Sequence, residues 1–283
     1  MEDHPLRRTK TTLHYRTLKD MKRLLALSLL AAMLVPACVA LAASPKTTFA
    51  HAKNDAHTDV AGGAVGSVAG VVRISTFSEN CTGAVIAPRV VLTAAHCLDD
   101  VLDKGTIRVL LDHTHQNLGV AAYYIAPGFD PATHVDDAAI LILKSPSKEP
   151  ALQVMSLEPP AGTGAMITGY GQQTYASAVT TVAYSADTTI QSFASCQASW
   201  AEYGTAVPSS DICAESPDNN DTVTRGDSGG PLLVKSRTGS WSIAGINDLV
   251  VIPNDVYDGA IPQAFGRVDT LRPWIEGEIA RLG

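Results

Sequence analysis

The stretch of the chain with the clearest chemical content is Gly226-Asp227-Ser228-Gly229-Gly230-Pro231. A serine between glycines lets the backbone turn sharply and brings amide N–H groups close to a bound carbonyl, where they can stabilise the oxyanion of acyl transfer. The string also satisfies the G-x-S-x-G nucleophile elbow of α/β-hydrolases. In that fold the catalytic histidine follows the serine, whereas the last histidine here is His134. That fold is therefore excluded, and a histidine base must lie upstream of Ser228.

The upstream candidates for the base are His96, His113, His115 and His134. His96 follows an apolar run that begins at Val90, and a disulfide at its neighbour Cys97 would hold it rigidly. His113 and His115 are separated by one residue, and no further ligand cluster supports a metal there, so a solvated loop or strand edge is favoured. The fourth histidine is expected on a loop. These contexts favour His96.

A third group should orient the histidine and stabilise its imidazolium form. Asp137 precedes the apolar run Ala138–Leu143, and an acid at the mouth of a buried strand is costly unless it is paired. Asp136 is the rival candidate. Each residue alone has a plainer interpretation, as a surface acid or a core histidine. Together, the order His96, Asp137, Ser228 favours nucleophilic catalysis.

The elements that must position these residues are mostly strands. Short apolar runs, many of them β-branched, recur between Gly, Pro, Asn and Asp clusters, which predicts an all-β barrel or sandwich. The runs are Gly70–Ile74, Ala84–Ile86, Arg89–Thr93, Ile107–Leu111, Val120–Ile125, Ala138–Leu143, Ala165–Thr168, Val179–Tyr184, Pro231–Val234 and Trp241–Ile246. Asp269–Arg281 differs, because its apolar residues Leu271, Trp274, Ile275 and Ile279 share one helical face, with Pro273 in the first turn. It predicts a C-terminal helix.

The start of the chain differs from the rest in charge and composition. Residues 1–42 carry seven basic and three acidic side chains, a net +4, and the whole chain carries −7, which leaves −11 for residues 43–283. Such an acidic balance argues against a general nucleic-acid binder. Met21-Lys22-Arg23, the uncharged run Leu24–Val35 and an Ala-x-Ala end describe a secretory signal peptide cleaved before Ala43.

Two alternatives to a cleaved signal peptide are a membrane anchor over Leu24–Ala43 and a lipid-modified Cys38. Residues 43–59 are polar and are interpreted as a pro-segment or linker, followed by one domain over residues 60–283. Removal of the leader leaves Cys81, Cys97, Cys196 and Cys213. An exported chain is expected to form two disulfides from them, and composition does not choose among the three pairings.

The motifs together identify the chain as similar to the chymotrypsin/trypsin-like serine peptidases, of the secreted, bacterial type. The matching segments are Thr93–Cys97, Asp137–Leu141, Gly226–Pro231, Gly169-Tyr170-Gly171, and Phe265–Val268 with Trp274-Ile275, and the resemblance covers about residues 60–283. It implies two six-stranded antiparallel β-barrels packed face to face, with a C-terminal α-helix. It also implies a secreted, monomeric serine endopeptidase that acts on proteins or peptides. No cofactor, metal or nucleic acid is expected, and no membrane after leader cleavage.

The resemblance assigns roles to individual residues. Ser228 attacks the peptide carbonyl, His96 takes and returns the proton, and Asp137 holds the histidine tautomer. The N–H groups of Gly226 and Ser228 form the oxyanion hole. The disulfides it implies are Cys81–Cys97 and Cys196–Cys213, each expected to stabilise the fold by about 2–4 kcal/mol.

The resemblance also bears on activation. Val60-Ala61-Gly62-Gly63 resembles the activated N-terminus of the family, whose freed α-amine pairs with the acid before the nucleophile, here Asp227. An activating protease would then cleave after Asp59. The plainer interpretation of this segment is a glycine-rich turn.

Specificity is less clear from the sequence. The register places Thr222 at the base of the substrate pocket, with Asp221 beside it, and the walls are assigned to Asp248, Leu249, Val250 and Gln263. These residues predict a narrowed pocket for a smaller or polar side chain. The altered wall leaves two alternatives open: a catalytically silent homologue that acts as a binding module, and an esterase on the same barrel.

Overall fold

A computed structural model describes residues 61–99, 101 and 103–281. The predicted signal peptide, the predicted pro-segment and Val60 lie outside these residues. The first closed barrel contains β2 (Val71–Ser75), β3 (Asn80–Ala87), β4 (Val90–Thr93), β5 (Arg108–Leu111), β6 (Gln116–Ile125) and β7 (Ala139–Leu143). Its strands follow the order β2-β3-β4-β7-β6-β5, and antiparallel pairing of β5 with β2 closes it.

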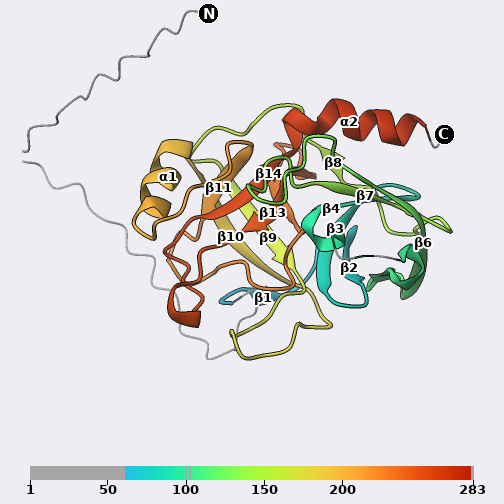
Figure 1. Ribbon diagram of the computed structural model, residues 1–283, viewed down its shortest axis with the longest axis horizontal. Helices are drawn as coiled ribbons and strands as arrows, with labels where there is room; N and C mark the ends of the chain where they lie inside the picture. Colours follow the sequence, from blue (N-terminus) through green and yellow to red (C-terminus); the bar gives the residue numbers. More distant parts are fainter. Residues whose placement is uncertain (1–60, 100, 102, 282–283) are drawn as a thin grey trace, which may run out of the picture. The chain divides into compact units, whose positions relative to one another are not determined.

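The second barrel contains β9 (Gly164–Gly169), β10 (Tyr184–Gln191), β11 (Asp211–Glu215), β12 (Pro231–Lys235), β13 (Trp241–Leu249) and β14 (Gln263–Arg267). Its order is β9-β10-β11-β14-β13-β12, closed by β12 against β9. Two short strands attach to it: β1 (Ala64–Val65) on β10, and β8 (Gln153–Val154) parallel to β13. Figure 1 shows the two barrels side by side. The predicted pair of six-stranded barrels is therefore confirmed.

One apolar cluster joins the first barrel to parts of the second. It includes the fully buried strand β7 and reaches Leu233 and Ile243 of the second barrel. Helix α2 (Val268–Ala280) adds Leu271 and Ile275 to the same cluster. Because the interiors are continuous, the loops between the barrels are held in a fixed relation to each other.

The predicted C-terminal helix is confirmed as α2, with two differences. It begins one residue earlier, at Val268, and Pro273 lies inside it rather than in its first turn. Trp274 and Ile279 pack partly buried against the apolar cluster, as the helical pattern predicts. Within the described ranges, no helix is both long and apolar enough to cross a membrane.

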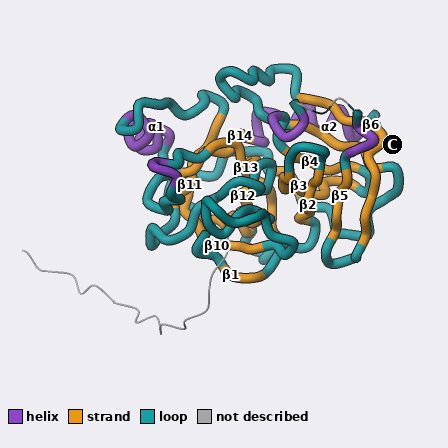
Figure 2. Tube along the Cα trace, turned by 60° about the horizontal axis from the view of Figure 1, so that its bottom comes forward, coloured by secondary structure: helices purple, strands orange, loops and turns teal. Residues whose placement is uncertain are grey.

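A second helix, α1 (Phe193–Ala201), has weak sequence signals and was not predicted. The side chain of Ser192 caps its first turn, accepting from Ser195 N–H at 3.1 Å, and only Cys196 and Trp200 are buried along it. Trp200 Nε1–H donates to the carbonyl of Pro262 at 2.7 Å. Figure 2 shows α1 beside β11, at the end of the molecule away from α2.

The predicted strand Val179–Tyr184 is wrong. Only Val179 forms a bridge, to Gln172, and the regular strand β10 begins at Tyr184. The reason is that β10 buries alternate positions, of which Ala186 is small, Thr188 is polar and only Ile190 is large and apolar, so it has no continuous apolar run. Three short 3-10 helices complete the described elements: η2 (His96–Leu98), η3 (Lys104–Thr106) and η4 (Pro253–Asp255).

Candidate active site

His96 and Asp137 meet because β4 and β7 are neighbours. Their antiparallel register pairs Thr93 with Ala139, so the residues just after β4 face those just before β7. Asp137 is fully buried; its Oδ1 accepts from the backbone N–H of His96 at 2.8 Å, and its Oδ2 lies 2.5 Å from His96 Nδ1. Burial alone would raise the pKa of Asp137, but the nearby imidazoles of His134 and His96 hold it well below its usual range. The carboxylate is therefore charged and orients the His96 ring.

The rival acid, Asp136, points elsewhere. A Cβ on Gly128 would lie 2.2 Å from Asp136 Oδ2, which places that carboxylate against Gly128. The Asp136 backbone N–H donates to Ser210 Oγ at 2.9 Å. Of the two candidate acids, Asp137 is the one that contacts His96.

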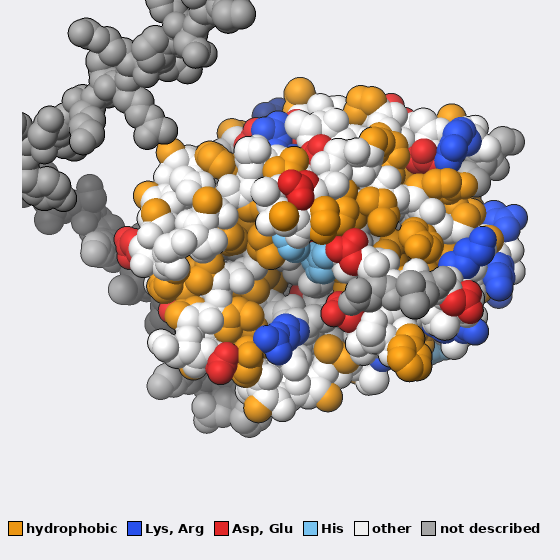
Figure 3. All heavy atoms as spheres, in the orientation of Figure 1, with side chains coloured by type: hydrophobic (Ala, Val, Ile, Leu, Met, Phe, Trp, Pro, Cys, Tyr) orange, Lys and Arg blue, Asp and Glu red, His pale blue; other side chains and the backbone are white. Residues whose placement is uncertain are grey.

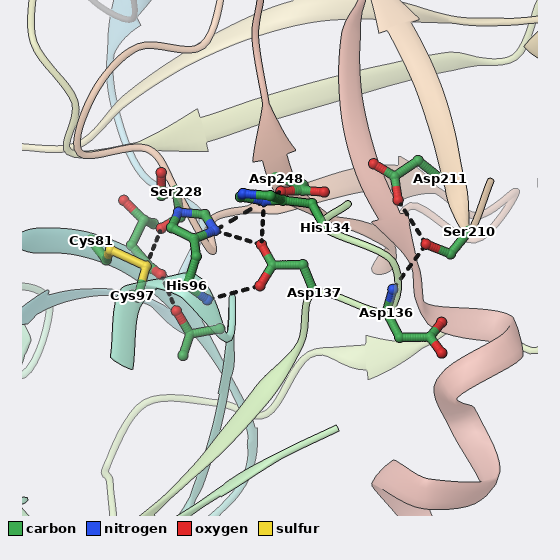
Figure 4. A network of polar contacts seen from close by, with 12 residues as sticks. Cys81, His96, Cys97, His134, Asp136, Asp137, Ser210, Asp211, Ser228 and Asp248 are labelled. Carbon is green, nitrogen blue, oxygen red and sulfur yellow. Dashed lines mark hydrogen bonds and ion pairs between the residues drawn. A yellow bond between two sulfur atoms is a disulfide. The ribbon is translucent and has the colours of Figure 1, made fainter. Parts of the chain in front are cut away.

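The loop that carries Ser228 docks on the end of β4. Thr82 N–H donates to the carbonyl of Ser228 at 2.8 Å. A Cβ on Gly229 would lie 2.1 Å from Thr93 Oγ1 and 2.7 Å from Ala94 N, so this loop packs directly beside the residues that precede His96. Figure 4 shows Ser228 and Asp137 on opposite sides of the His96 ring.

Both predicted disulfides are present. Cys81–Cys97 joins β3 to the residue after His96. Cys97 Sγ lies 3.7 Å from the carbonyl oxygen of Ser228, a packing contact because a disulfide sulfur carries no proton to donate. Cys196–Cys213 joins α1 to β11. The first disulfide therefore braces the meeting point of the histidine and serine segments.

Thr82, which the sequence did not single out, connects the two barrels at this point. Its hydroxyl donates to the carbonyl of Gly226 at 2.8 Å and accepts from the N–H of Tyr170 at 3.1 Å. Its own carbonyl accepts from Thr93 Oγ1 at 2.8 Å. The only feature of the sequence that could have pointed to Thr82 is its position next to Cys81, a residue of the predicted disulfide.

The turn before Ser228 leaves backbone donors available. Gly226 has φ +102°, a conformation that glycine adopts without strain. Within the part of the chain that the structure describes, the N–H groups of Gly226 and Ser228 donate to no backbone or side-chain acceptor. They are the two groups that the sequence assigned to an oxyanion hole.

Asp227 is buried and surrounded by neutral donors. Its Oδ1 accepts from Gly171 N–H at 2.7 Å, and its Oδ2 accepts from the N–H and the hydroxyl of Thr224 at 2.8 and 2.9 Å. Burial raises the pKa of Asp227 to about 6 in spite of these hydrogen bonds. Val60, its predicted partner, lies outside the described residues, and Ala61 pairs with Thr222.

A second histidine–aspartate pair lies against the first. His134 Nδ1 is 2.7 Å from Asp248 Oδ1, His134 Nδ1 is 3.8 Å from Asp137 Oδ2, and His96 Nδ1 is 3.9 Å from Asp248 Oδ1. The carboxylates of Asp137 and Asp248 raise the pKa of His134 to about 10, so His134 is a cation at neutral pH. Burial raises the pKa of Asp248 to about 7.

Neither member of this second pair was placed here by the sequence. His134 was expected on a loop, which it is, and Asp248 was assigned to the pocket wall, whereas its carboxylate faces His134. The sequence feature that could have indicated His134 is that it lies only three residues before Asp137. Each of His96, His134, Asp137 and Asp248 offers one ligand atom, and the four atoms lie within 4.8 Å of one another.

Asp211 extends this group of acids. Burial, followed by the charge of Asp248, raises the pKa of Asp211 to about 9, and Ser210 Oγ donates to its Oδ1 at 3.2 Å. A carboxyl group protonated at neutral pH can lie beside Asp248 without adding a second negative charge.

The side chains of His96 and His134 are partly exposed, whereas those of Asp137 and Asp248 are buried. Figure 3 shows histidine surface near the centre of one face.

The other predicted pocket residues are buried or half-buried near β13 and β14. Gln263 is fully buried, its Nε2 donating to the carbonyl of Ile261 at 2.8 Å while its Oε1 has no partner. The β-sheet register places Leu249 opposite Ala264, beside Gln263, and Val250 follows β13. Thr222 is buried and its N–H donates to the carbonyl of Ala61 at 3.1 Å.

Asp221, which lies next to Thr222, faces the N-terminal segment. A Cβ on Gly62 would lie 2.0 Å from Asp221 Oδ1. Burial, followed by the charges of Asp218 and Asp187, raises the pKa of Asp221 to about 6. The resemblance left open that a one-residue shift of the loop brings Asp221 into the pocket base, where the acid of trypsins binds Lys or Arg. The orientation toward Gly62 gives no support to that alternative.

Comparison with known proteins agrees with this architecture. Residues 59–275 match the family described as Trypsin. The chain is 28% identical to a trypsin of Sarcophaga bullata over 213 residues, which covers 71% of this chain and 80% of the relative. It is 29% identical to trypsin alpha-4 of Lucilia cuprina over 210 residues, covering 70% and 77%. Because these relatives are insect proteins, they give no support to the bacterial-type assignment.

Proposed function

We propose that this chain, which belongs to the trypsin family, is a serine endopeptidase that uses Ser228, His96 and Asp137 as a catalytic triad. The observation that carries the proposal is the double contact of Asp137 with the backbone N–H and the Nδ1 of His96, at 2.8 and 2.5 Å. A carboxylate held in this way fixes the ring so that Nε2 is available to the nucleophile. The Ser228 loop, docked on the end of β4, supplies that nucleophile.

The mechanism follows from these positions. His96 Nε2 takes the Ser228 hydroxyl proton as Oγ attacks the peptide carbonyl, and it then gives the proton to the leaving amine. The Asp137 carboxylate stabilises the imidazolium that forms. The N–H groups of Gly226 and Ser228 bind the oxyanion, and Thr82 fixes this turn by holding the carbonyl of Gly226. Water then attacks the acyl-enzyme: His96 Nε2 takes a proton from the water and gives it to Ser228 Oγ, which leaves as the free hydroxyl.

Activation by cleavage before Val60 is part of the proposal. Ala61, which follows Val60 in the sequence, pairs with Thr222, six residues before Ser228. Asp227, buried among neutral donors, would be stabilised as an anion by a cationic α-amine. Secretion is proposed from the predicted signal peptide and the two disulfides.

For specificity, we propose a small or polar side chain at the position before the cleaved bond. Thr222 is neutral, Gln263 offers a buried acceptor without a partner, and the carboxylate of Asp221 faces Gly62. A peptide library cleaved by the processed enzyme tests this directly. Dominant cleavage after Lys or Arg would contradict it.

The test of the activity itself is covalent labelling by a serine-directed organophosphonate. The N-terminally processed protein is expected to be labelled once, at Ser228, and the Ser228→Ala variant not at all. A folded, processed sample that takes no label would overturn the peptidase proposal. That result would favour the alternative, a catalytically silent binding homologue, which the sequence supports only by its predicted change in the pocket wall.

A further inference from the structure

His96, His134, Asp137 and Asp248 offer a donor set beyond the triad. Two imidazole nitrogens and two carboxylate oxygens converge from three separate segments: the start of η2, the loop before β7, and β13. Both carboxylates are buried, and both histidine side chains are partly exposed, at 19% and 25%. Figure 4 shows the four side chains pointing toward one another. Among the described residues, solvent therefore reaches the cluster from the histidine side.

We propose that these four residues form a site for a divalent transition-metal cation of the zinc class, and that the cation inhibits the enzyme. Imidazole nitrogen combined with carboxylate oxygen suits zinc and similar ions, whereas calcium and magnesium prefer oxygen alone. Two carboxylates balance the charge of a divalent ion. The inhibitory effect rests on the proposed peptidase function, but the binding does not.

The distances fit such an ion with small adjustments. Tetrahedral coordination at about 2.0–2.2 Å places ligand atoms about 3.3–3.6 Å apart. Here the two bonded pairs are at 2.5 and 2.7 Å, and the two cross distances are 3.8 and 3.9 Å. The bonded pairs must open and the cross distances must close, each by less than about 1 Å. The other two separations, between the two histidine nitrogens and between the two carboxylate oxygens, lie within 4.8 Å and must close by up to about 1.5 Å. The second oxygen of Asp137 stays held by the backbone N–H of His96, which keeps that carboxylate oriented.

Binding here removes the base from the triad. In the resting triad, neutral His96 carries its proton on Nδ1, toward Asp137, and its Nε2 lone pair accepts the Ser228 proton. A metal bound at Nδ1 uses the lone pair of that nitrogen, so the Nδ1 proton moves to Nε2. The Nε2 lone pair is then occupied and no longer available as the base. A proton on Nδ1 of His134 is released to water when that atom binds the metal. Both effects are reversed when a chelator removes the ion.

The test measures binding without relying on activity. The full chain carrying Ser228→Ala is titrated with Co²⁺, whose visible absorption reports nitrogen and oxygen ligands, and Zn²⁺ is then added as competitor. We expect one ion per chain, with no displacement by excess Ca²⁺ or Mg²⁺. His134→Gln and Asp248→Asn, made separately in that background, are each expected to weaken binding at least ten-fold. His113→Gln, which removes an imidazole paired with Ser67 outside the cluster, is the matched control and is expected to bind as the parent does.

Two further measurements make every outcome decisive. Anomalous scattering at the zinc edge locates the ion in crystals of the Ser228→Ala protein, and an ion bound elsewhere would overturn the proposal. The titration would overturn it if there is no saturable binding, or if folded His134→Gln or Asp248→Asn binds as tightly as the parent. Zn²⁺ should also slow phosphonate labelling of the wild type, with recovery after chelation. Labelling without metal binding would contradict the metal-site proposal and support the peptidase proposal. Metal binding at the cluster without labelling would contradict the peptidase and inhibition proposals and support the metal site.

Discussion

The hydroxyl of Thr82 in the first barrel donates to the carbonyl of Gly226 in the second, at 2.8 Å. This bond joins β3 to the turn that presents Ser228. The backbone N–H of Thr82 adds a bond to the carbonyl of Ser228, so one residue holds both ends of the turn. The nucleophile segment is therefore positioned by the barrel that carries the histidine and the acid, and not only by its own.

Thr82→Val is expected to lower kcat/KM about ten-fold or more, because the turn loses its fixed orientation. The valine also leaves the carbonyl of Gly226 and the N–H of Tyr170 unpaired in the interior, which should reduce the free energy of unfolding by roughly 1–3 kcal/mol. Steady-state kinetics and urea unfolding measure the two effects. Thr82→Ser keeps the hydroxyl and should restore activity; a serine variant as impaired as the valine variant would contradict this role.

The sequence predicted most elements because their signals are local, whereas the pair of six-stranded barrels was expected from the family resemblance. The β-branched runs marked most strands, and the helical pattern of Leu271 and Ile275 marked α2. The segments around His96, Asp137 and Ser228 each carry a recognisable motif, so the residues expected to meet could be named before the fold was known. The disulfide pairing came from the resemblance, since four cysteines alone allow three pairings.

The features that the sequence did not predict depend on contacts between distant segments. Asp248 meets His134 only because β13 passes beside the loop before β7, a distance of 114 residues along the chain. Thr82 reaches Gly226 across 144 residues. Helix α1 buries only Cys196 and Trp200, so it has no apolar stripe to detect.

Asp227→Asn is expected to reduce kcat/KM of the N-terminally processed enzyme on the order of 100-fold, because a neutral amide cannot pair with a cationic amine to shape the oxyanion turn. The unprocessed chain, in which Asp227 has neutral donors, should change much less. Kinetics on both forms, with the N-terminus read by mass spectrometry, separate these effects. Fully active wild-type enzyme that begins at Ala43 would refute activation at Val60.

Asp221→Asn is expected to raise the melting temperature at neutral pH by roughly 1–4 °C and to change it little near pH 4. The pKa of Asp221 is about 6 in the folded protein, above the ordinary aspartate value of 3.8, so the folded state binds more protons between these values. Stability contributed by this group is therefore present at low pH and lost as the pH rises through about 6. Thermal unfolding at pH 4 and pH 7.5 measures the difference.

Asp218 supplies the control with the opposite sign. The hydroxyl of Ser216 lowers the pKa of Asp218, so its stabilising effect is present at neutral pH and lost on acidification. Asp218→Asn should therefore lower the melting temperature at neutral pH. Equal shifts for the two variants at both pH values would show that the titration of Asp221 does not contribute.

Gly229→Ala is expected to reduce kcat/KM about 100-fold or more, because it forces the nucleophile loop away from β4. Gly229 has φ +78°, and an added Cβ would lie 2.1 Å from Thr93 Oγ1 and 2.5 Å from the carbonyl oxygen of Thr82. Gly239→Ala is the matched control, since φ there is +89° and a Cβ meets nothing within 4 Å. It should cost a similar backbone strain, roughly 1 kcal/mol of unfolding free energy, and leave the labelling rate of Ser228 unchanged. If Gly229→Ala labels at the same rate as Gly239→Ala, close packing of this loop on β4 does not position the serine.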